Sequence, residues 1–244
     1  MSARITLATA LRVGSQLIRD RRTLALVVVV PPGLIALLDY IFDQQPQAFE
    51  RVGPPLVGMF PLIMMFLITS IAMLRERTTG TLERLMSMPL SKLDLLAGYG
   101  LAFALVAAVQ ATITAGVAFG LLDMPAEGPI WALVALAVAN AVLGMALGLF
   151  LSAFATSEFQ AVQFMPAFIL PQLLLAGLFV PRDQMPDVLE TISDFLPFTY
   201  AYDALAKVAV DDFDGRLWLD VGVVCGCIVL ALVLGAMTLR RRTA

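Results

Sequence analysis

The stretch LVGMFPLIMMFLITSIAML, residues 56–74, contains no charged side chain over nineteen consecutive positions. An α-helix rises about 1.5 Å per residue, so about 20 residues cross the roughly 30 Å hydrocarbon core of a bilayer. The whole chain agrees with this segment, because 60% of its 244 residues are hydrophobic and only 14% are charged. A soluble domain carries about 25% charged residues. The composition therefore excludes most cytosolic enzymes and predicts a membrane protein.

Five further stretches share this length and this lack of central charges. They are rich in Leu, Ala, Val and Met without the alternation of a transmembrane β-strand, so we expect helices rather than a barrel. The six predicted spans are Leu24–Phe42, Leu56–Leu74, Leu95–Leu122, Pro129–Ser157, Phe159–Pro181 and Val221–Leu239. The predicted fold is an all-α membrane protein with six transmembrane helices. Residues 1–244 are expected to form one transmembrane domain without a nucleotide-binding domain.

The charged residues are sorted between the two sides of the predicted bundle. With six spans, the termini share a side with the second-to-third and fourth-to-fifth loops, and this side carries twelve of the sixteen Lys and Arg residues. Acidic residues are divided the other way, with five on this side and fourteen on the opposite one. Because Lys and Arg mark cytoplasmic loops, we expect both termini in the cytoplasm. We further expect the protein in the plasma membrane.

Several kinds of chemistry have no candidate residues. The sequence contains no His, and Cys225 and Cys227 point to different sides of an expected helix, so we predict neither a catalytic residue nor a metal site. No ionisable residue lies near the centre of a span, which argues against an ion-driven carrier. Neither Lys92 nor Lys207 lies in a P-loop. The chain is therefore expected to carry no cofactor and not to hydrolyse ATP by itself.

Two amphipathic segments are predicted on the cytoplasmic side. Before the first span, apolar residues recur at helical spacing between Arg4, Arg12 and Arg19, which predicts an interfacial helix, or a basic anchor without a further role. In the loop after the second span, Gly80 can act as an N-cap, with Glu83 placed to reach back to it. The apolar face of this loop helix would consist of Leu82, Leu85 and Met86, and Pro89 would end it. Such a helix suits a groove on a soluble partner, and equally an interfacial role that only stabilises the loop.

Other features predict bends, contacts and external helices. Pro166 and Pro171 predict a kink or a break in the fifth span. The connection from Arg182 to Asp220 predicts two amphipathic extracellular helices, separated at Pro197. Three glycine pairs have a spacing that permits close contact between helices. These pairs are Gly116/Gly120, Gly144/Gly148 and Gly222/Gly226.

Several motifs together resemble one protein family. The loop sequence ERTTGTLE, residues 76–83, followed by Pro89-Leu90 and Lys92-Leu93, closely resembles the cytoplasmic loop of type-two permease subunits of ATP-binding-cassette exporters. LPQ at 170–172, GLFVPRDQMP at 177–186 and LPFTYA at 196–201 resemble the fifth span and the outer segment of that family. The resemblance extends over nearly the whole chain in order and spacing.

The resemblance implies partners and roles. It implies pairing with a second permease copy, identical or related, and with two ATPase subunits that bind ATP and Mg²⁺. The loop helix would be the coupling helix and the N-terminal helix the connecting helix. The implied ATPase-coupling residues are Glu76, Gly80, Thr81, Leu82, Glu83, Leu85, Met86 and Pro89. The expected substrate pathway between the second and fifth spans, assigned by position in the spans, consists of Phe60, Met64, Thr69, Gln163, Phe168 and Gln172.

Two functions follow from these observations. The first is the permease subunit of an exporter that moves a hydrophobic or amphiphilic substrate, such as a drug, lipid or glycolipid, by alternating access. The second is a membrane scaffold or assembly factor that docks a cytoplasmic partner without transport. Membrane lipid is an expected partner of both, and nucleic acid of neither.

Overall fold

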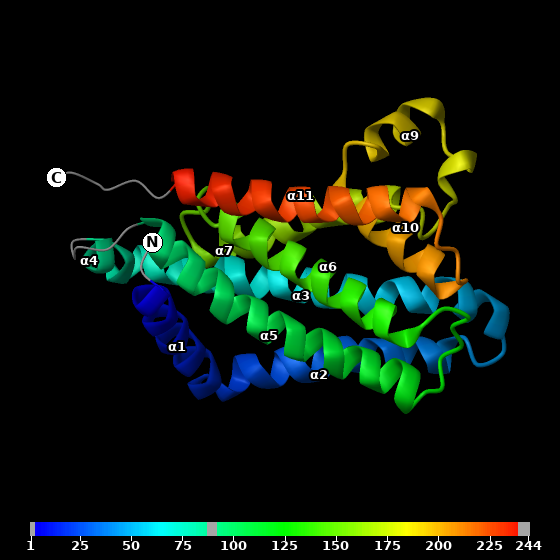
Figure 1. The fold of residues 1–244 in the computed structure, drawn as a ribbon, viewed down its shortest axis with the longest axis horizontal. Coiled ribbons are helices and arrows are strands. Elements are labelled where there is room, and N and C mark those ends of the chain that lie inside the picture. Colours follow the sequence, from blue (N-terminus) through cyan, green and yellow to red (C-terminus); the bar gives the residue numbers. More distant parts are fainter. Residues whose placement is uncertain (1–2, 87–91, 239–244) are drawn as a thin grey trace.

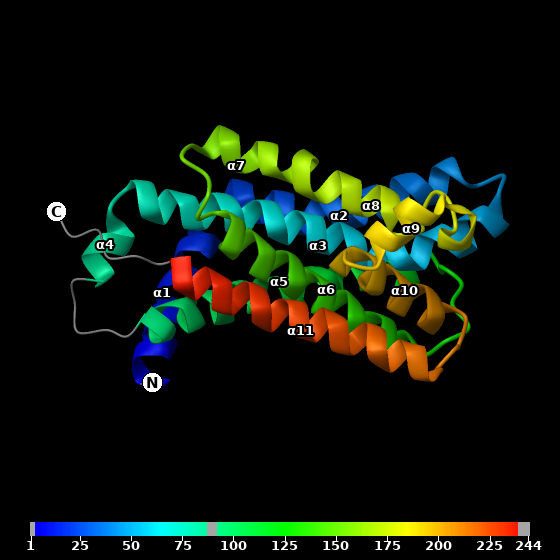
Figure 2. The ribbon, with the colours of Figure 1, turned by 90° about the horizontal axis from the view of Figure 1, so that it is seen from above.

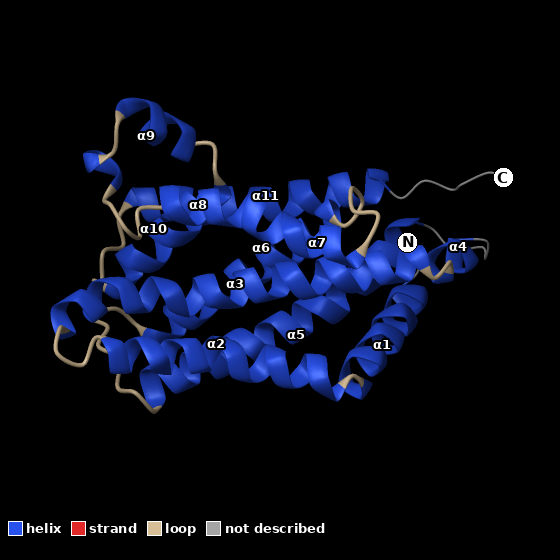
Figure 3. Cartoon of the chain, turned by 180° about the vertical axis from the view of Figure 1, so that it is seen from behind, coloured by secondary structure: helices blue, strands red, loops and turns tan. Residues whose placement is uncertain are grey.

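The computed structural model describes residues 3–86 and 92–238, without the side chains of Pro46, Leu82, Glu83, Met86, Lys92 and Leu93. Over these ranges the chain is helical and contains no strand, as the sequence predicts. The long helices lie lengthwise in one bundle, with most loops at its two ends (Figure 3). α1 (Ala3–Arg19) and α4 (Thr81–Met86) lie at one end, here called the α4 end, and α9 (Asp187–Ser193) lies at the other, the α9 end (Figure 1).

Five helices of the described residues are long and apolar enough to cross a membrane. They are α2 (Arg21–Ile41), α3 (Pro46–Thr78), α5 (Lys92–Gly120), α6 (Ile130–Leu151) and α11 (Gly215–Thr238). Each contains most of one predicted span. α3 extends beyond both of its predicted ends, whereas α6 stops before the predicted boundary at Ser157.

The predicted fifth span, Phe159–Pro181, is divided. α7 (Glu158–Phe164) leads into a π-helical turn, η1 (Met165–Ile169), and then into α8 (Leu170–Leu175). The ring of Pro171 lacks an N–H and clashes with the carbonyl four residues earlier in an α-helix, which a wider turn relieves. The helix stops before Gly177, whose φ of 100° is in the left-handed region, and so does not reach Pro181. This segment runs beside α3 along the bundle (Figure 2).

α3 and α6 approach each other closely in the core. A Cβ atom on Gly144 would lie 2.0 Å from the carbonyl oxygen of Leu62, and one on Gly148 would lie 2.4 Å from that of Phe66. Only glycine permits this approach. For the glycines of the other two predicted pairs, no described atom of another segment lies within 4 Å of such a Cβ: Gly116, Gly120, Gly222 and Gly226. Glycine spacing therefore marks a helix contact in one of the three pairs.

α1 and α2 are separate helices because Asp20 caps the second one. The Asp20 carboxylate accepts hydrogen bonds from the backbone N–H of Thr23 (3.2 Å) and from its hydroxyl (2.7 Å), and these bonds lower the pKa of Asp20. α1 packs against α5, where Thr9 lies against Gly98. The apolar residues Leu7, Leu11 and Ile18 of α1 are exposed. One side of α1 thus packs against the bundle, and another side presents exposed apolar side chains.

The segment between α8 and α11 contains η2 (Arg182–Gln184), α9 and α10 (Pro197–Ala209). Two helices therefore lie where the sequence predicts two, and α10 begins at Pro197. α10 is held in the bundle by buried Tyr202 and Leu205. α9 is different, since its apolar Val188 is 69% exposed and Phe195, just after it, is 83% exposed. α9 consequently presents an apolar surface away from this chain.

Candidate functional site

α3 continues into α4 through a very short connection at Gly80. The φ of Gly80 is 72°, in the region that favours glycine. The N–H of Thr79 donates to the carbonyl of Arg75 (3.0 Å), and the N–H of Arg84 donates to the carbonyl of Gly80 (3.0 Å), which opens α4 as an N-cap carbonyl does. Since so few residues separate the two helices, the orientation of α4 depends on that of α3.

The predicted coupling residues lie on or beside this connection. Glu76 is near the end of α3, Gly80 and Thr81 begin α4, and the half-buried Leu85 packs against the core. The backbone of Leu82, Glu83 and Met86 belongs to α4, but their side chains, and Pro89 entirely, lie outside the described residues. The predicted apolar face of Leu82, Leu85 and Met86 therefore stays a prediction.

Arg12, Glu76 and Tyr99 join α1, α3 and α5 at the α4 end. Nη1 of Arg12 lies 3.4 Å from Oε1 of Glu76, and its Nη2 donates to the hydroxyl of Tyr99 (2.5 Å). The guanidinium carbon also lies 5.5 Å from the centroid of the Tyr99 ring. The Glu76 side chain is 14% exposed, so water screens this charge pair only weakly.

Sequence reasoning placed Glu76 at a partner contact and missed its link to the N-terminal helix. Arg12 offered a signal, because it interrupts the apolar pattern of the first helix. Tyr99 offered none, since a single tyrosine near the start of an apolar span is common. A second pair, Arg75 Nε to Glu158 Oε1 at 3.0 Å, links α3 to α7, but both side chains are more than half exposed. Such a surface pair contributes at most about 1 kcal/mol.

The six predicted pathway residues do not share one surface of this chain. Thr69 is buried between α3 and α6, where its hydroxyl donates to the carbonyl of Met65 (2.6 Å) and lies 3.3 Å from that of Met145. Gln172 is buried in α8, and its amide Nε2 donates to the carbonyl of Phe168 (3.0 Å). Met64 lines a cavity on another side of α3.

The other three predicted pathway residues are more accessible. The ring of Phe168 stacks on that of Phe66, with centroids 6.4 Å apart and planes 13° from parallel. This contact places the π-helical turn against α3. Gln163 is exposed on α7, and Phe60 is half-buried on α3. The structure thus brings Phe168 to α3 and leaves Gln163 facing away from the chain.

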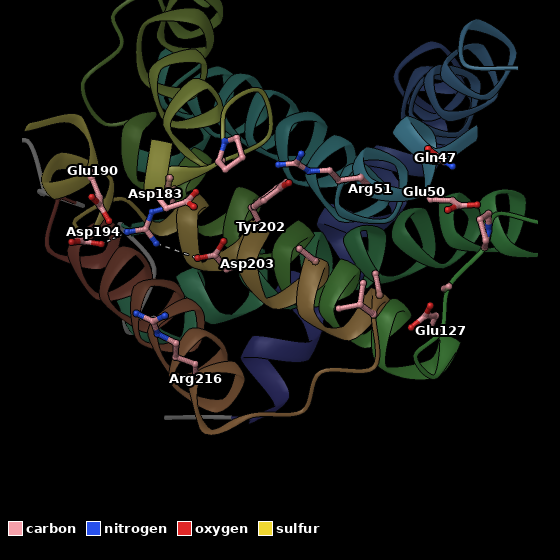
Figure 4. A pocket seen from close by; sticks show the side chains of 18 residues that line it. Gln47, Glu50, Arg51, Glu127, Asp183, Glu190, Asp194, Tyr202, Asp203 and Arg216 are labelled. Carbon is pink, nitrogen blue, oxygen red and sulfur yellow. Dashed lines mark hydrogen bonds and ion pairs between the residues drawn. The ribbon is translucent and has the colours of Figure 1, made fainter. Parts of the chain in front are cut away.

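A polar cavity of about 1000 Å³ opens at the α9 end (Figure 4). Arg182 lies at its centre and forms ion pairs with two aspartates, Asp194 and Asp203. The distance from Nη1 of Arg182 to Oδ2 of Asp203 is 3.2 Å. Nε of Arg182 also donates a hydrogen bond to the hydroxyl of Ser193 (2.9 Å). Figure 4 shows Arg51 beside Tyr202. The charged residues that line the cavity are Glu50, Arg51, Glu127, Arg182, Asp183, Glu190, Asp194, Asp203 and Arg216. Acidic residues outnumber basic ones in this lining.

Burial changes the proton affinities around this cavity. Burial raises the pKa of Asp203, and the nearby Arg182 opposes this change only in part. Burial also raises the pKa of Tyr202, against the opposing charge of Arg51. Beyond the cavity, Asp214 accepts the backbone N–H of Leu217 (2.7 Å) at the start of α11, which lowers the pKa of Asp214. Within residues 3–86 and 92–238, no group of three or more His, Cys, Asp or Glu side chains could hold a metal ion.

The helical bundle with its apolar helices defines a multi-pass membrane protein. A sequence model of the ABC-2 type transporter membrane family matches residues 6–210, from α1 to the end of α10. The chain therefore belongs to the ABC-2 type transporter family.

Curated relatives agree with this family. The probable multidrug ABC transporter permease YbhR of Escherichia coli (strain K12) is 27% identical over 161 residues, which are 66% of this chain and 44% of the relative. The linearmycin resistance permease protein LnrN of Bacillus subtilis (strain 168) is 24% identical over 163 residues, 64% of this chain and 40% of the relative. Nodulation protein J of Rhizobium leguminosarum bv. viciae is 30% identical over 91 residues, 37% of this chain and 35% of the relative. The chain spans less than half the length of these relatives.

Proposed function

We propose that this chain is the membrane-spanning permease subunit of an ATP-driven exporter of hydrophobic or amphiphilic molecules. The family supports a permease, and two relatives are named for multidrug and linearmycin resistance. ATP and Mg²⁺ would bind to a separate ATPase subunit, because the sequence of this chain has no P-loop.

The observation that carries the proposal is the continuity of α3. One helix runs from Glu50 and Arg51 at the polar cavity to Glu76 at the opposite end, and α4 follows directly. A soluble motor that moved α4 would therefore displace a helix that reaches the other side of the bundle. The Arg12–Glu76–Tyr99 cluster would carry the same displacement to α1 and α5.

The proposed arrangement has six passes, with α7, η1 and α8 as the fifth. These eighteen residues rise about 27 Å as helix, close to the roughly 30 Å hydrocarbon core. Both termini and α4 would lie in the cytoplasm of a plasma-membrane protein, in accordance with the distribution of Lys and Arg. The complete transporter would contain a second permease copy and two ATPase subunits.

The proposed pathway lies where α3 and the fifth segment of two copies would meet. The exposed Gln163 and Phe168 are accessible for this contact, with Phe60 on the neighbouring helix. Thr69 and Gln172 are buried in the single chain, so they would reach a substrate only when α3 and α8 move apart from their present neighbours. Met64 would reach it only by rotation of α3.

The test is co-purification followed by reconstitution. The full chain is purified from its native membranes, and the proposal expects an ATPase subunit to accompany it. Reconstituted together in proteoliposomes, the two should accumulate a fluorescent amphiphile in an ATP-dependent manner. Leu82→Asp and Glu83→Ala should lower ATP-driven transport at least about tenfold while the variants still insert into the membrane, because they alter the proposed contact with the motor.

Val188→Asp is the matched control, because it introduces the same charge as Leu82→Asp on the exposed face of α9 at the opposite end. It should leave co-purification and coupling unchanged. Normal transport by both loop variants would contradict the role of α4 as a coupling helix. A complex that binds the ATPase but moves no amphiphile would contradict export and favour a scaffold.

A further inference from the structure

A second cavity, of about 480 Å³, lies at the α4 end between α1, α2, α3 and α5. Its volume is within the range of about 300–1,000 Å³ that small-molecule sites occupy. Its walls are mainly apolar, and those on α3 and α5 are formed by Met64, Leu67, Ile68, Ile71, Ala72 and Phe103. The polar cavity at the α9 end is lined by entirely different residues.

The polar end of this cavity contains an unused hydrogen-bond acceptor. Glu76 lines the cavity, and its carboxylate interacts with Arg12 and with the hydroxyl of Tyr99, but its buried Oε2 atom has no hydrogen bond of ordinary geometry among the described residues. A buried carboxylate oxygen without a donor is destabilising, because the hydrogen bonds that it made with water are not replaced. A ligand that donated a hydrogen bond there would remove this cost.

The other charges around the cavity favour a cationic donor. Asp20 and Arg75 both line it, and the charge of Arg75 is paired with Glu158, which does not belong to the lining. Phe103 also lines the cavity, and an aromatic ring can contact a cation through its face. The cavity thus combines one free acceptor, Oε2 of Glu76, with one apolar space. This combination suits a ligand with one ammonium group and a single apolar chain.

We propose that this cavity binds a single-chain cationic amphiphile, with its primary ammonium group on Oε2 of Glu76 and its chain along the apolar face of α3. Bound there, the ligand contacts the carboxylate that joins α1 to α3. Because side chains of both α1 and α3 line the cavity, the bound ligand bridges these two helices. This site does not depend on the proposed transport function, because binding is a property of this chain alone.

The experiment measures photolabelling of the purified full chain in phosphatidylcholine nanodiscs, with no ATPase or transport assay. The probe is dodecylamine that carries a diazirine in its chain, and labelled peptides are identified by mass spectrometry. Labelling should saturate and fall within residues 13–26, 64–79 or 99–103. Unlabelled dodecylamine should compete at least about tenfold more strongly than dodecanol or dodecanoate at equal bilayer concentration, since a charge-assisted hydrogen bond is the stronger one.

Two variants separate the ammonium contact from the apolar space. Glu76→Gln keeps the side-chain shape but removes the charge, and it should weaken dodecylamine about tenfold while dodecanol is unchanged. Ala72→Phe fills the cavity and should abolish labelling at these residues. The matched controls are Glu50→Gln, which removes a carboxylate at the polar cavity of the α9 end, and Ala104→Phe, which lies in a separate apolar groove beside α11. Both controls should label as the unmodified chain does.

Three results would overturn the proposal. Equal competition by amine, alcohol and carboxylate would remove the role of Glu76, and this comparison needs no variant that might fold poorly. Persistent labelling in folded Ala72→Phe would place the ligand elsewhere. Displacement of the probe by added phosphatidylethanolamine, a two-chain lipid with an ammonium head, would assign the cavity to lipid instead of a single-chain ligand.

Discussion

α3 has two helical neighbours that are held in opposite ways. Its contact with α6 depends on backbone approach, with Gly144 and Gly148 directly against the carbonyls of Leu62 and Phe66. Its contact with the fifth segment depends on a few side chains, such as Phe168 stacked on Phe66, beside a π-helical turn. Beyond that turn, charges around Arg182 hold the outer cap of η2, α9 and α10. The contact between α3 and α6 is therefore the more constrained of the two, because it leaves no room for a side chain at Gly144 or Gly148.

The strongest test of this difference is Gly144→Ala. The added Cβ would lie 2.0 Å from the carbonyl oxygen of Leu62, so the two helices must separate. We expect a loss of about 3 kcal/mol in the free energy of unfolding, the upper part of the usual range for overpacking. Thermal unfolding of the purified protein in one detergent measures it.

Gly222→Ala is the matched control for Gly144→Ala. No described atom of another segment lies within 4 Å of its Cβ position, and Ala is the better helix former. Its unfolding temperature should stay the same or rise. Equal destabilisation by the two substitutions would contradict a special role for the α3–α6 contact.

In the outer cap, Arg182→Gln should have a smaller effect. The substitution leaves Asp203 without its partner, and both side chains are less than one-third exposed. We expect a loss of about 2 kcal/mol, below the cost of breaking a fully buried pair. Limited proteolysis between α8 and α10 would detect local opening. Arg216→Gln is the control, because Arg216 lines the same cavity without an ion pair among the described residues, and it should change stability by less than about 0.5 kcal/mol.

At the π-helical turn, Pro171→Ala should stiffen the fifth segment. The alanine restores an N–H that can donate to the carbonyl of Ala167, and it removes the clash that favours the wider turn. Backbone amides between Met165 and Leu175 should exchange about fivefold more slowly with deuterium. Pro129→Ala, at the cap before α6, should leave the exchange of α6 unchanged. Unchanged exchange in the Pro171 variant would show that the turn does not depend on this proline.

The smallest expected effect is the pH dependence that Asp203 and Asp214 contribute near the α9 end. The raised pKa of Asp203 means that this group favours the folded state below pH about 4, and that this contribution is lost as the pH rises through the raised pKa. The lowered pKa of Asp214 acts in the other direction, so its contribution is present above pH about 4 and is lost as the pH falls.

The unfolding temperature between pH 3 and 7 tests both signs. Asp203→Asn should reduce the loss of stability as the pH rises, and Asp214→Asn should reduce the loss as it falls. If both substitutions changed the slope of unfolding temperature against pH in the same sense, the assigned directions of the two pKa changes would be contradicted. The α3–α6 contact contains no titratable group in the contacts described above, so Gly144→Ala should shift the whole profile without changing its shape.

The sequence predicted the class of fold well, because a long uncharged stretch determines a membrane helix almost alone. It also predicted an interruption near Pro166 and Pro171, since proline has a fixed local effect. It did not distinguish Gly144 from Gly222, because the spacing of small residues does not reveal which helix lies opposite. For the same reason it could not separate buried Thr69 from exposed Gln163 among the candidate pathway residues. Arg12 and Tyr99 were missed because they meet only when α1 folds back onto α5.

The length of α3 has a further consequence for the choice of membrane. Its 33 residues rise about 50 Å, whereas the hydrocarbon core is about 30 Å thick. The excess must be divided between tilt and overhang, and the thickness of the surrounding bilayer changes that division. In a thin bilayer Glu76 would stand farther from the hydrocarbon, and water would reach its pairing with Arg12 more easily. The lipids around the protein would thus adjust the strength of that pairing without binding to it.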